Sequence, residues 1–366
     1  AEPWDTVIAF SLASGSGEQN EPLLPYTISP LVNAPALPRS TLDGEVDTAS
    51  YALTVTSRPF PKGRIKFGYR YDERDNTTLQ SGWNRVISDF FVSGDIVQNV
   101  PYSFERSTLS LGGELVVWKG IRISGGGERK ELKRDFQEVA EQTTDAGWGQ
   151  ARWRPLDWLD LRLKGGAEER DIDRYNESIA VSLGQNPLLR KYNLAYRYRS
   201  YGELTASIMP VDAPVSITTT VLFADDRYNK SLLGMTDSEE TRVTADLTWT
   251  PSESTSFYLL AGHESIDALQ LGSENFDRYD WSATHEDAFN HLGAGFRWRD
   301  ADGKYDLRVD FNRSDGDTNI DMNSISGGQS ALPDLESTLN SARIEATWRW
   351  TDSLDGTLDL RYEDFK

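Results

Sequence analysis

The stretch Gly63–Glu73, which reads Gly-Arg-Ile-Lys-Phe-Gly-Tyr-Arg-Tyr-Asp-Glu, alternates apolar and charged side chains. Because successive residues of a strand point to opposite sides, one face would be apolar and the other charged. The apolar face would carry Ile65, Phe67, Tyr69 and Tyr71, and the charged face Arg64, Lys66, Arg70 and Asp72. The same alternation recurs along the whole chain, and we see no helical segment that could cover the apolar faces. Lipid outside and water inside would satisfy such strands, so the pattern predicts an all-β protein, a large transmembrane antiparallel up-and-down β-barrel.

The composition limits the other classes of protein. The chain has 366 residues and a net charge of −20, whereas binding to nucleic acid needs a concentrated basic face, so nucleic acid is excluded as a partner. No stretch approaches the roughly 18 apolar residues of a membrane-spanning helix. The chain has no cysteine, which rules out disulfides, thiolate metal sites and covalent haem attachment to this chain. We see no linker between hairpins and expect residues 1–366 to form a single domain.

Short turns rich in proline and glycine alternate with long hydrophilic connections, and together they divide the chain into hairpins. An additional, unpaired strand is expected at about 4–12, ahead of the first hairpin. The long connections are mostly acidic at their tips, as in Asp72–Asn76, Glu168–Asp173 and Asp315–Asn319. The predicted hairpins cover 49–57/63–73, 104–118/120–129, 146–154/158–169, 197–209/214–225, 240–249/255–265, 289–299/304–313 and 340–350/356–363.

The unequal connections predict the orientation of the barrel. Outer-membrane barrels have short turns on the periplasmic side and long loops outside, so we expect short periplasmic turns and long acidic extracellular loops. Several tryptophans lie within a few residues of a predicted short turn, and an indole ring is favoured at a membrane boundary. We therefore expect an aromatic ring at this membrane interface, formed by Trp118, Trp153, Trp158, Trp249, Trp298, Trp348 and Trp350.

The strand face opposite the lipid carries charges of both signs. Leucines alternate with Asp160, Arg162 and Lys164, and the segments 305–311 and 343–350 repeat this pattern. Unpaired charge in a dry interior costs several kcal/mol per ion, so the pattern predicts a lumen filled with water or with protein. About fifteen strands are visible, an odd number, whereas bacterial single-chain barrels usually have an even one. We therefore expect an incomplete barrel that lacks strands at both ends.

The sequence suggests two kinds of chemical site and favours neither. A hydrolase would need a histidine beside a serine or an aspartate, and nothing in the sequence positions His263, His285 or His291 in this way, so we expect no enzyme. The stretch 315–321 spaces oxygen ligands like the start of a calcium loop, but it lacks the glycine and the glutamate of an EF-hand, and a solvated acidic loop is the default interpretation. The weak candidate calcium loop consists of Asp315, Asp317, Asn319 and Asp321.

Several strings of residues resemble a known family. Glu21–Pro30, Leu37–Thr48, Ser57–Phe60 and Gly68–Asn76 are together similar to the decahaem-associated outer-membrane barrels of the MtrB/PioB type. The Asp-Gly-Glu-Val-Asp stretch at 43–47 is the most specific part of this similarity. The resemblance covers most of the chain and matches such a barrel without its N-terminal part and its closing C-terminal strands.

The resemblance implies a scaffolding function in the bacterial outer membrane. In that family the barrel is a sheath that holds a periplasmic multihaem c-type cytochrome across the membrane, where it meets an extracellular multihaem cytochrome. The partner would then carry the haem, and this chain would bind no cofactor, apart from possible calcium in a loop. The alternative is a large porin that passes solutes through the same polar lumen. Contacts to the enclosed partner are expected from the lumen-facing residues Lys66, Arg70, Arg122, Arg162, Lys164, Arg308, Arg343 and Arg349.

Overall fold

The fold is a single large antiparallel sheet that curves into a wall. A computed structural model describes residues 4–88, 91–182, 184–275, 277–324, 328–351 and 353–366. Within them, seventeen strands form one sheet, and two further strands form a separate hairpin. The strands of the large sheet are β1 (Asp5–Gln19), β2 (Gly44–Phe60), β3 (Gly63–Asn76), β6 (Phe104–Trp118), β7 (Ile121–Arg134), β8 (Glu141–Leu156), β9 (Leu159–Ile172), β10 (Leu189–Arg190), β11 (Arg197–Ile208), β12 (Val215–Arg227), β13 (Leu233–Ser252), β14 (Thr255–Gly272), β15 (Trp281–Arg299), β16 (Tyr305–Ser324), β17 (Gly328–Ala331), β18 (Leu335–Thr351) and β19 (Leu354–Phe365).

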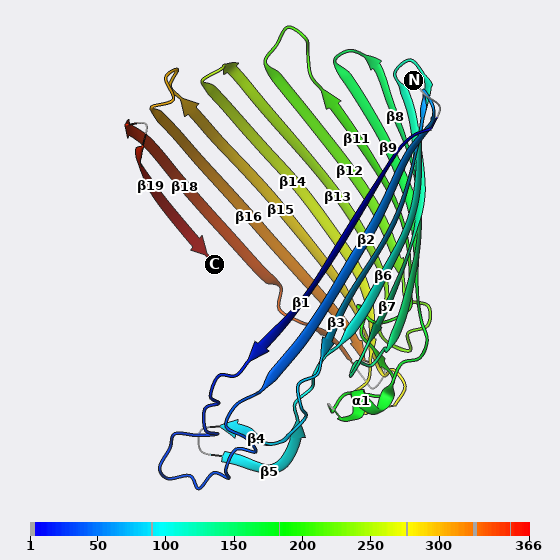
Figure 1. Cartoon of the computed structure of the whole chain (residues 1–366), viewed down its shortest axis with the longest axis vertical. Coiled ribbons are helices and arrows are strands. Elements are labelled where there is room, and N and C mark those ends of the chain that lie inside the picture. Colours follow the sequence, from blue (N-terminus) through cyan, green and yellow to red (C-terminus); the bar gives the residue numbers. More distant parts are fainter. Residues whose placement is uncertain (1–3, 89–90, 183, 276, 325–327, 352) are drawn as a thin grey trace.

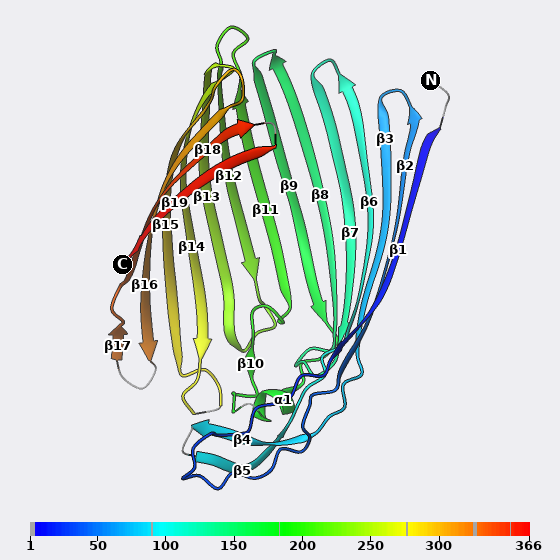
Figure 2. The same cartoon turned by 60° about the vertical axis from the view of Figure 1, so that its left-hand side comes forward.

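The long strands run alternately up and down, and each pairs antiparallel with the next long strand along the chain, from β1 to β19. Figures 1 and 2 show the resulting curved wall, with the short hairpin turns at the upper end and the longer connections at the lower end. Among the described residues β1 and β19 share no ladder, so the wall is open between these two edge strands. This architecture confirms the predicted all-β, antiparallel up-and-down fold.

The strand at the N-terminal edge differs from the expectation. It was predicted at about 4–12 without a partner, whereas β1 pairs with β2 along its whole length, from Asp5 opposite Arg58 to Gln19 opposite Gly44. This ladder satisfies the backbone groups of β1 that face β2, and a strand crossing lipid needs such pairing. The prediction of an unpaired strand was therefore wrong, because the long connection 20–43 hides the hairpin in the sequence.

Several strands also continue beyond their predicted ends. The acidic segments Asp72–Asn76, Glu168–Asp173 and Asp315–Asn319 were expected at loop tips, but they lie wholly or almost wholly in β3, β9 and β16. Ladder pairing continues there because the charged side chains find partners on neighbouring strands. Asp72, for example, accepts hydrogen bonds from Ser50 of β2 and Arg106 of β6. Strand lengths consequently reach 20 residues in β13 and β16, against 12 in β11.

The longer connections contain secondary structure of their own, including a short helix that was not predicted from the sequence. Strands β4 (Gly82–Ser88) and β5 (Phe91–Gln98) form a hairpin between β3 and β6, and helix α1 (Glu177–Ser182) lies between β9 and β11. Both project beyond the lower end of the wall in Figures 1 and 2. Among the described residues, no helix is both long enough and apolar enough to span a membrane.

The connection 173–196, called the α1 loop here, docks against the sheet. Its strand β10 pairs in parallel with the first residues of β13, Leu189 opposite Leu233 and Arg190 opposite Gly234. Strand β12 has already ended at this height, because its last residue, Arg227, pairs with Asp237. The α1 loop therefore takes the position beside β13 that β12 leaves empty.

Candidate lumen wall

The strand registers divide the side chains of the wall into two faces. Directly paired residues of neighbouring antiparallel strands point to the same side, so a face can be followed from strand to strand. One face, called the polar face, carries Lys66, Arg162 and Arg308. The other, called the apolar face, carries Leu111 of β6 and Leu163 of β9 among other large aliphatic side chains. Such a division suits a wall with lipid on one side and a polar interior on the other.

All eight basic residues that the sequence predicted to face the lumen lie on the polar face. They come from β3, β7, β9, β16 and β18, so the registers distribute them around the wall and do not gather them in one site. That this face lines the lumen, and that these residues touch a partner, stays a prediction. The eight are Lys66, Arg70, Arg122, Arg162, Lys164, Arg308, Arg343 and Arg349.

The seven predicted interface tryptophans lie at the short-turn end of the sheet. Trp153, Trp249, Trp298 and Trp348 lie on the apolar face by their registers. Trp118, Trp158 and Trp350 lie at hairpin ends, where the pairing shifts or a turn begins. Trp249 stacks on Phe257 with ring centroids 5.2 Å apart, so aromatic contacts join neighbouring strands at this height. Their place at a membrane boundary remains the prediction made from the sequence.

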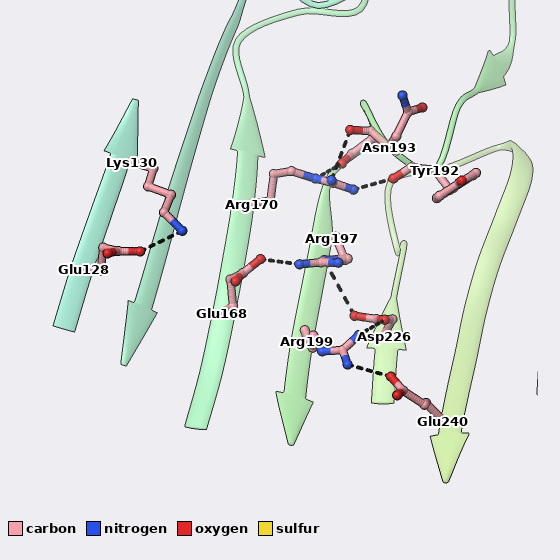
Figure 3. Close-up of polar contacts among 11 residues, drawn as sticks. Glu128, Lys130, Glu168, Arg170, Tyr192, Asn193, Arg197, Arg199, Asp226 and Glu240 are labelled. Atoms are coloured by element: carbon pink, nitrogen blue, oxygen red, sulfur yellow. Dashed lines mark hydrogen bonds and ion pairs between the residues drawn. The ribbon is translucent and has the colours of Figure 1, made fainter. Parts of the chain in front are cut away.

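A chain of ion pairs crosses four strands on the polar face near the longer connections (Figure 3). Arg197 of β11 bonds Glu168 of β9, and Arg199 bonds Asp226 of β12 at 2.7 Å and Glu240 of β13 at 2.8 Å. Arg197 also lies 3.6 Å from Asp226, so both arginines share this buried carboxylate. Because each carboxylate in this network of ion pairs has an arginine partner, the four strands are linked by charge as well as by backbone hydrogen bonds.

Arg170, near the end of β9, binds the α1 loop to the sheet. Its guanidinium is buried and donates to three backbone carbonyls of the loop, those of Tyr192, Asn193 and Ala195, the last at 2.8 Å (Figure 3). The Arg170 side chain thus satisfies carbonyls that neither helix nor sheet pairing would satisfy. This function could not be predicted from the sequence, because Arg170 alternates along β9 like any other charged residue.

The α1 loop also contacts the neighbouring connection 135–140. Val139, Tyr175 and Leu194 form a small buried cluster, and beside it Lys191 donates a hydrogen bond to the buried carboxylate of Glu138. Burial raises the pKa of Glu138, but the hydrogen bond from Lys191 and the nearby positive charges outweigh it and hold this pKa below its usual value. The charged form of Glu138 therefore stabilises the docked loop.

This pKa shift predicts that acid weakens the docking of the α1 loop. A carboxylate whose folded-state pKa is depressed stabilises the fold above its unfolded-state pKa and loses this contribution as the pH falls through the folded-state value. We expect proteolysis within 173–196 to accelerate below about pH 4. Glu138→Gln should show the fast cleavage already at pH 7, from a loss of about 1–3 kcal/mol.

The matched control is Glu177→Gln, because Glu177 pairs with Arg190 of the same loop at 2.9 Å but is half exposed. Its cleavage should match that of the unsubstituted protein. Equal cleavage of the Glu138→Gln variant and the unsubstituted protein at pH 7 would contradict the assigned function of Glu138.

Two groups of arginines at the short-turn end of the polar face were also not predicted from the sequence. At the end of β8, Arg152 and Arg154 both bond Asp160 of β9, at 2.8 and 3.0 Å. At the end of β15, Arg297 and Arg299 both bond Asp306 of β16, at 2.9 and 2.5 Å. A signal was present in the sequence, because Arg-Trp-Arg precedes both short turns and Asp-Leu-Arg follows both: 152–154 with 160–162, and 297–299 with 306–308.

The candidate calcium loop is not a loop. Asp315, Asp317, Asn319 and Asp321 lie within β16 and pair with β15, and Asp315 and Asp317 pair with β18 as well. Alternate residues of one extended strand are about 6–7 Å apart, too far for their oxygens to surround one ion. Arg313 and Thr338 moreover bond Asp315 at 2.7 and 3.0 Å. Among the described residues, no three His, Asp or Glu side chains gather closely enough to hold a metal ion.

The three histidines lie in β14 and β15. His263 bonds Asn290 at 2.9 Å, His285 bonds Gln270 at 3.1 Å, and His291 bonds Ser314 at 2.7 Å. Of these contacts only the last joins a histidine to a serine. Within the described residues no carboxylate bonds the His291 ring, so the orienting group of a catalytic triad is not supplied there.

Comparisons with known proteins agree with this architecture. Residues 1–366 match the outer membrane beta-barrel porin family MtrB/PioB. Over 333 residues the chain is 26% identical to the outer membrane protein MtrB of Shewanella baltica (strain OS185), covering 90% of this chain and 47% of that protein. The chain thus spans about half the length of the curated relative it matches.

Solved structures also align with this chain, at TM-scores below 0.5. The FrpB iron transporter from Neisseria meningitidis aligns with a TM-score of 0.47 and 10% identity, over 100% of this chain and 78% of that one. OmpT, an outer membrane protein of Vibrio cholerae, aligns with a TM-score of 0.38 and 10% identity, over 98% and 97%. The match over the whole sequence decides the family: the chain belongs to the MtrB/PioB family of outer-membrane β-barrel proteins, which places its strands in the bacterial outer membrane.

Proposed function

We propose that this chain is part of a sheath in the outer membrane that houses a periplasmic multihaem c-type cytochrome and supports electron transfer to or from an extracellular multihaem cytochrome. The polar face would line the lumen and the apolar face would meet lipid. The chain would bind no haem itself. Short turns would lie in the periplasm and the longer connections, including the α1 loop, outside the cell.

The polar face is the observation that carries this proposal. Its charges of both signs continue from strand to strand, and many are held in ion pairs such as Arg162 with Glu203 and Arg343 with Asp359. A water-filled lumen would solvate such charges, but a wall of fixed, paired charges also offers a folded protein surface many complementary polar contacts. Membership of the MtrB/PioB family favours an enclosed cytochrome as that protein.

The second candidate function is a porin that passes solutes through the same lumen. The MtrB/PioB family is a family of outer-membrane β-barrel porins, and the polar face would suit an aqueous channel equally well. The two functions differ in what fills the lumen, protein or water, and this difference is measurable.

The test is purification of the full-length protein from native membranes in mild detergent, followed by a visible spectrum and a haem stain. We expect a c-type haem protein to co-purify in constant ratio to the barrel, since the contacts cover a large internal surface. The expected next result is electron transfer across proteoliposomes that contain the complex. A colourless barrel that conducts ions in a planar bilayer would overturn the sheath in favour of the porin.

A further inference from the structure

The arginine group around Asp306 encloses a pocket on the polar face. It has a volume of about 430 Å³ and lies where β15, β16 and β18 reach the short turns. It is called the rim pocket here. Its charged lining consists of Arg297, Arg299, Lys304, Arg308, Arg349, Asp306 and Glu345. Gly303 and Thr347 complete the wall. In the orientation proposed above, this is the periplasmic end of the lumen.

The rim pocket holds more positive than negative charge. Five basic side chains and two carboxylates line it, so three positive charges are left without a negative one in the lining. Arg297 and Arg299 share the single carboxylate of Asp306. Arg308 bonds Asp310, which lies outside the lining, at 2.8 Å. Lys304 and Arg349 form no ion pair among the described residues. An excess of this kind stands out in a chain whose net charge is −20.

The geometry of the rim pocket suits carboxylates. Arginine forks bind the two oxygens of a carboxylate at once, as Arg343 does with Asp359 elsewhere on this face. A space of about 430 Å³ accepts a few acidic side chains but not a folded element. The guanidinium groups of Arg297 and Arg299 are about half exposed, so a carboxylate arriving from the lumen would reach them.

The second arginine group argues for a large ligand over a small one. Arg122, Arg152 and Arg154 line a smaller pocket of about 140 Å³ at the short-turn end of β7 and β8. It repeats the arrangement of the rim pocket, with two arginines at the end of one strand and a shared aspartate, Asp160, on the next. Two such sites on one face, separated by several strands, would bind an extended acidic surface at two places.

We propose that the rim pocket is a docking site for acidic side chains of the protein enclosed by the barrel, and that it anchors this protein at the short-turn end of the lumen. The inference rests on the proposed sheath function and adds a place and a chemistry to it. The partner segment is defined by closely spaced Asp or Glu residues. The pocket binds it through Lys304 and Arg349 first, because these two cations are free of other ion pairs within the described part of the chain.

The test compares two variants of the full-length protein with equal changes of charge. Lys304→Gln with Arg349→Gln removes two cations from the rim pocket. Lys62→Gln with Arg64→Gln is the matched control, since it removes a turn lysine and a strand arginine at the same end of the sheet. Neither Lys62 nor Arg64 forms an ion pair within the described residues.

The first measurement is binding of fluorescently labelled hexaglutamate to the barrel freed of its partner by high salt. The second is the NaCl concentration at which half of the haem protein dissociates from the purified complex. We expect the pocket variant to bind hexaglutamate about tenfold or more weakly and to release the haem protein at lower salt, because charge-assisted hydrogen bonds are lost. The control should match the unsubstituted protein in both.

The outcomes separate this inference from the function on which it rests. Equal hexaglutamate affinity in both variants overturns the rim pocket as an anion site. Weaker hexaglutamate binding with unchanged release of the haem protein shows that the pocket takes a free anion, and overturns docking of the partner. Absence of any haem protein from the unsubstituted preparation overturns the sheath itself, a failure visible before either variant is made.

Discussion

Replacing Leu204 by arginine is expected to destabilise the barrel by about 2–4 kcal/mol, the cost of a basic residue on the lipid face near the middle of the membrane. Leu204 lies on the apolar face of β11, is 49% exposed, and pairs with Leu163 of β9 and Val221 of β12. No water would be present there to solvate a guanidinium, and no carboxylate lies among these neighbours. The measurement is the midpoint of urea unfolding in lipid vesicles, followed by tryptophan fluorescence.

Ser200→Arg is the matched control for this experiment. Ser200 lies on the same strand and the same face, four residues nearer the longer connections, and pairs with Asp225. An arginine at this depth is expected to cost about 0–1 kcal/mol, because it reaches the interface. If both variants unfold at the same urea concentration, the apolar face does not meet lipid at Leu204, and the proposed orientation of the two faces is wrong.

The replacement Arg170→Met should release the α1 loop while leaving the wall intact. The guanidinium supplies three hydrogen bonds to loop carbonyls, and a hydrogen bond to a charged group contributes about 1.5–3 kcal/mol. We expect a loss of about 3 kcal/mol or more in the free energy of loop docking. Hydrogen–deuterium exchange should accelerate at least a hundredfold within 173–196 and remain unchanged in the paired parts of β9 and β11.

Arg174→Gln provides the control, since Arg174 belongs to the same loop and its side chain is exposed. Its exchange should equal that of the unsubstituted protein. Uniform acceleration across β9 and β11 in the Arg170→Met variant would instead show that Arg170 supports the whole sheet, and unchanged exchange would show that the loop is held by other contacts.

The wall itself could be predicted from the sequence because its two-residue period is set by a local rule. Alternation places Lys66 and Phe67 on opposite faces wherever β3 lies in the barrel, so each face follows from one strand at a time. The same rule placed all eight predicted basic residues on one face. Proline and glycine marked the short turns, and with them the strand ends that carry Trp153 and Trp298.

The rest depends on contacts between strands, which alternation does not encode. The acidic and glycine residues around Asp315 are typical of a loop. In the structure, however, Asp315 pairs within a long ladder and accepts a hydrogen bond from Arg313. The partners of Arg170 lie more than twenty residues away in an irregular connection. The grouping of Arg297 with Arg349 requires β16 to bring β15 and β18 together, so it follows from the topology and not from either segment alone.

The unequal heights of neighbouring strands have a consequence for access from outside the cell. Strands β9, β11 and β12 have 12 to 14 residues, while β13 to β16 have 18 to 20, which leaves a notch in the wall beside β13. The α1 loop fills this notch. It is held there by Arg170, by the Glu138–Lys191 pair and by the two-residue strand β10. Its opening costs far less free energy than separating two long strands. In the orientation proposed above, undocking of the α1 loop would lower the wall beside β13 and expose the polar face there to the outside of the cell.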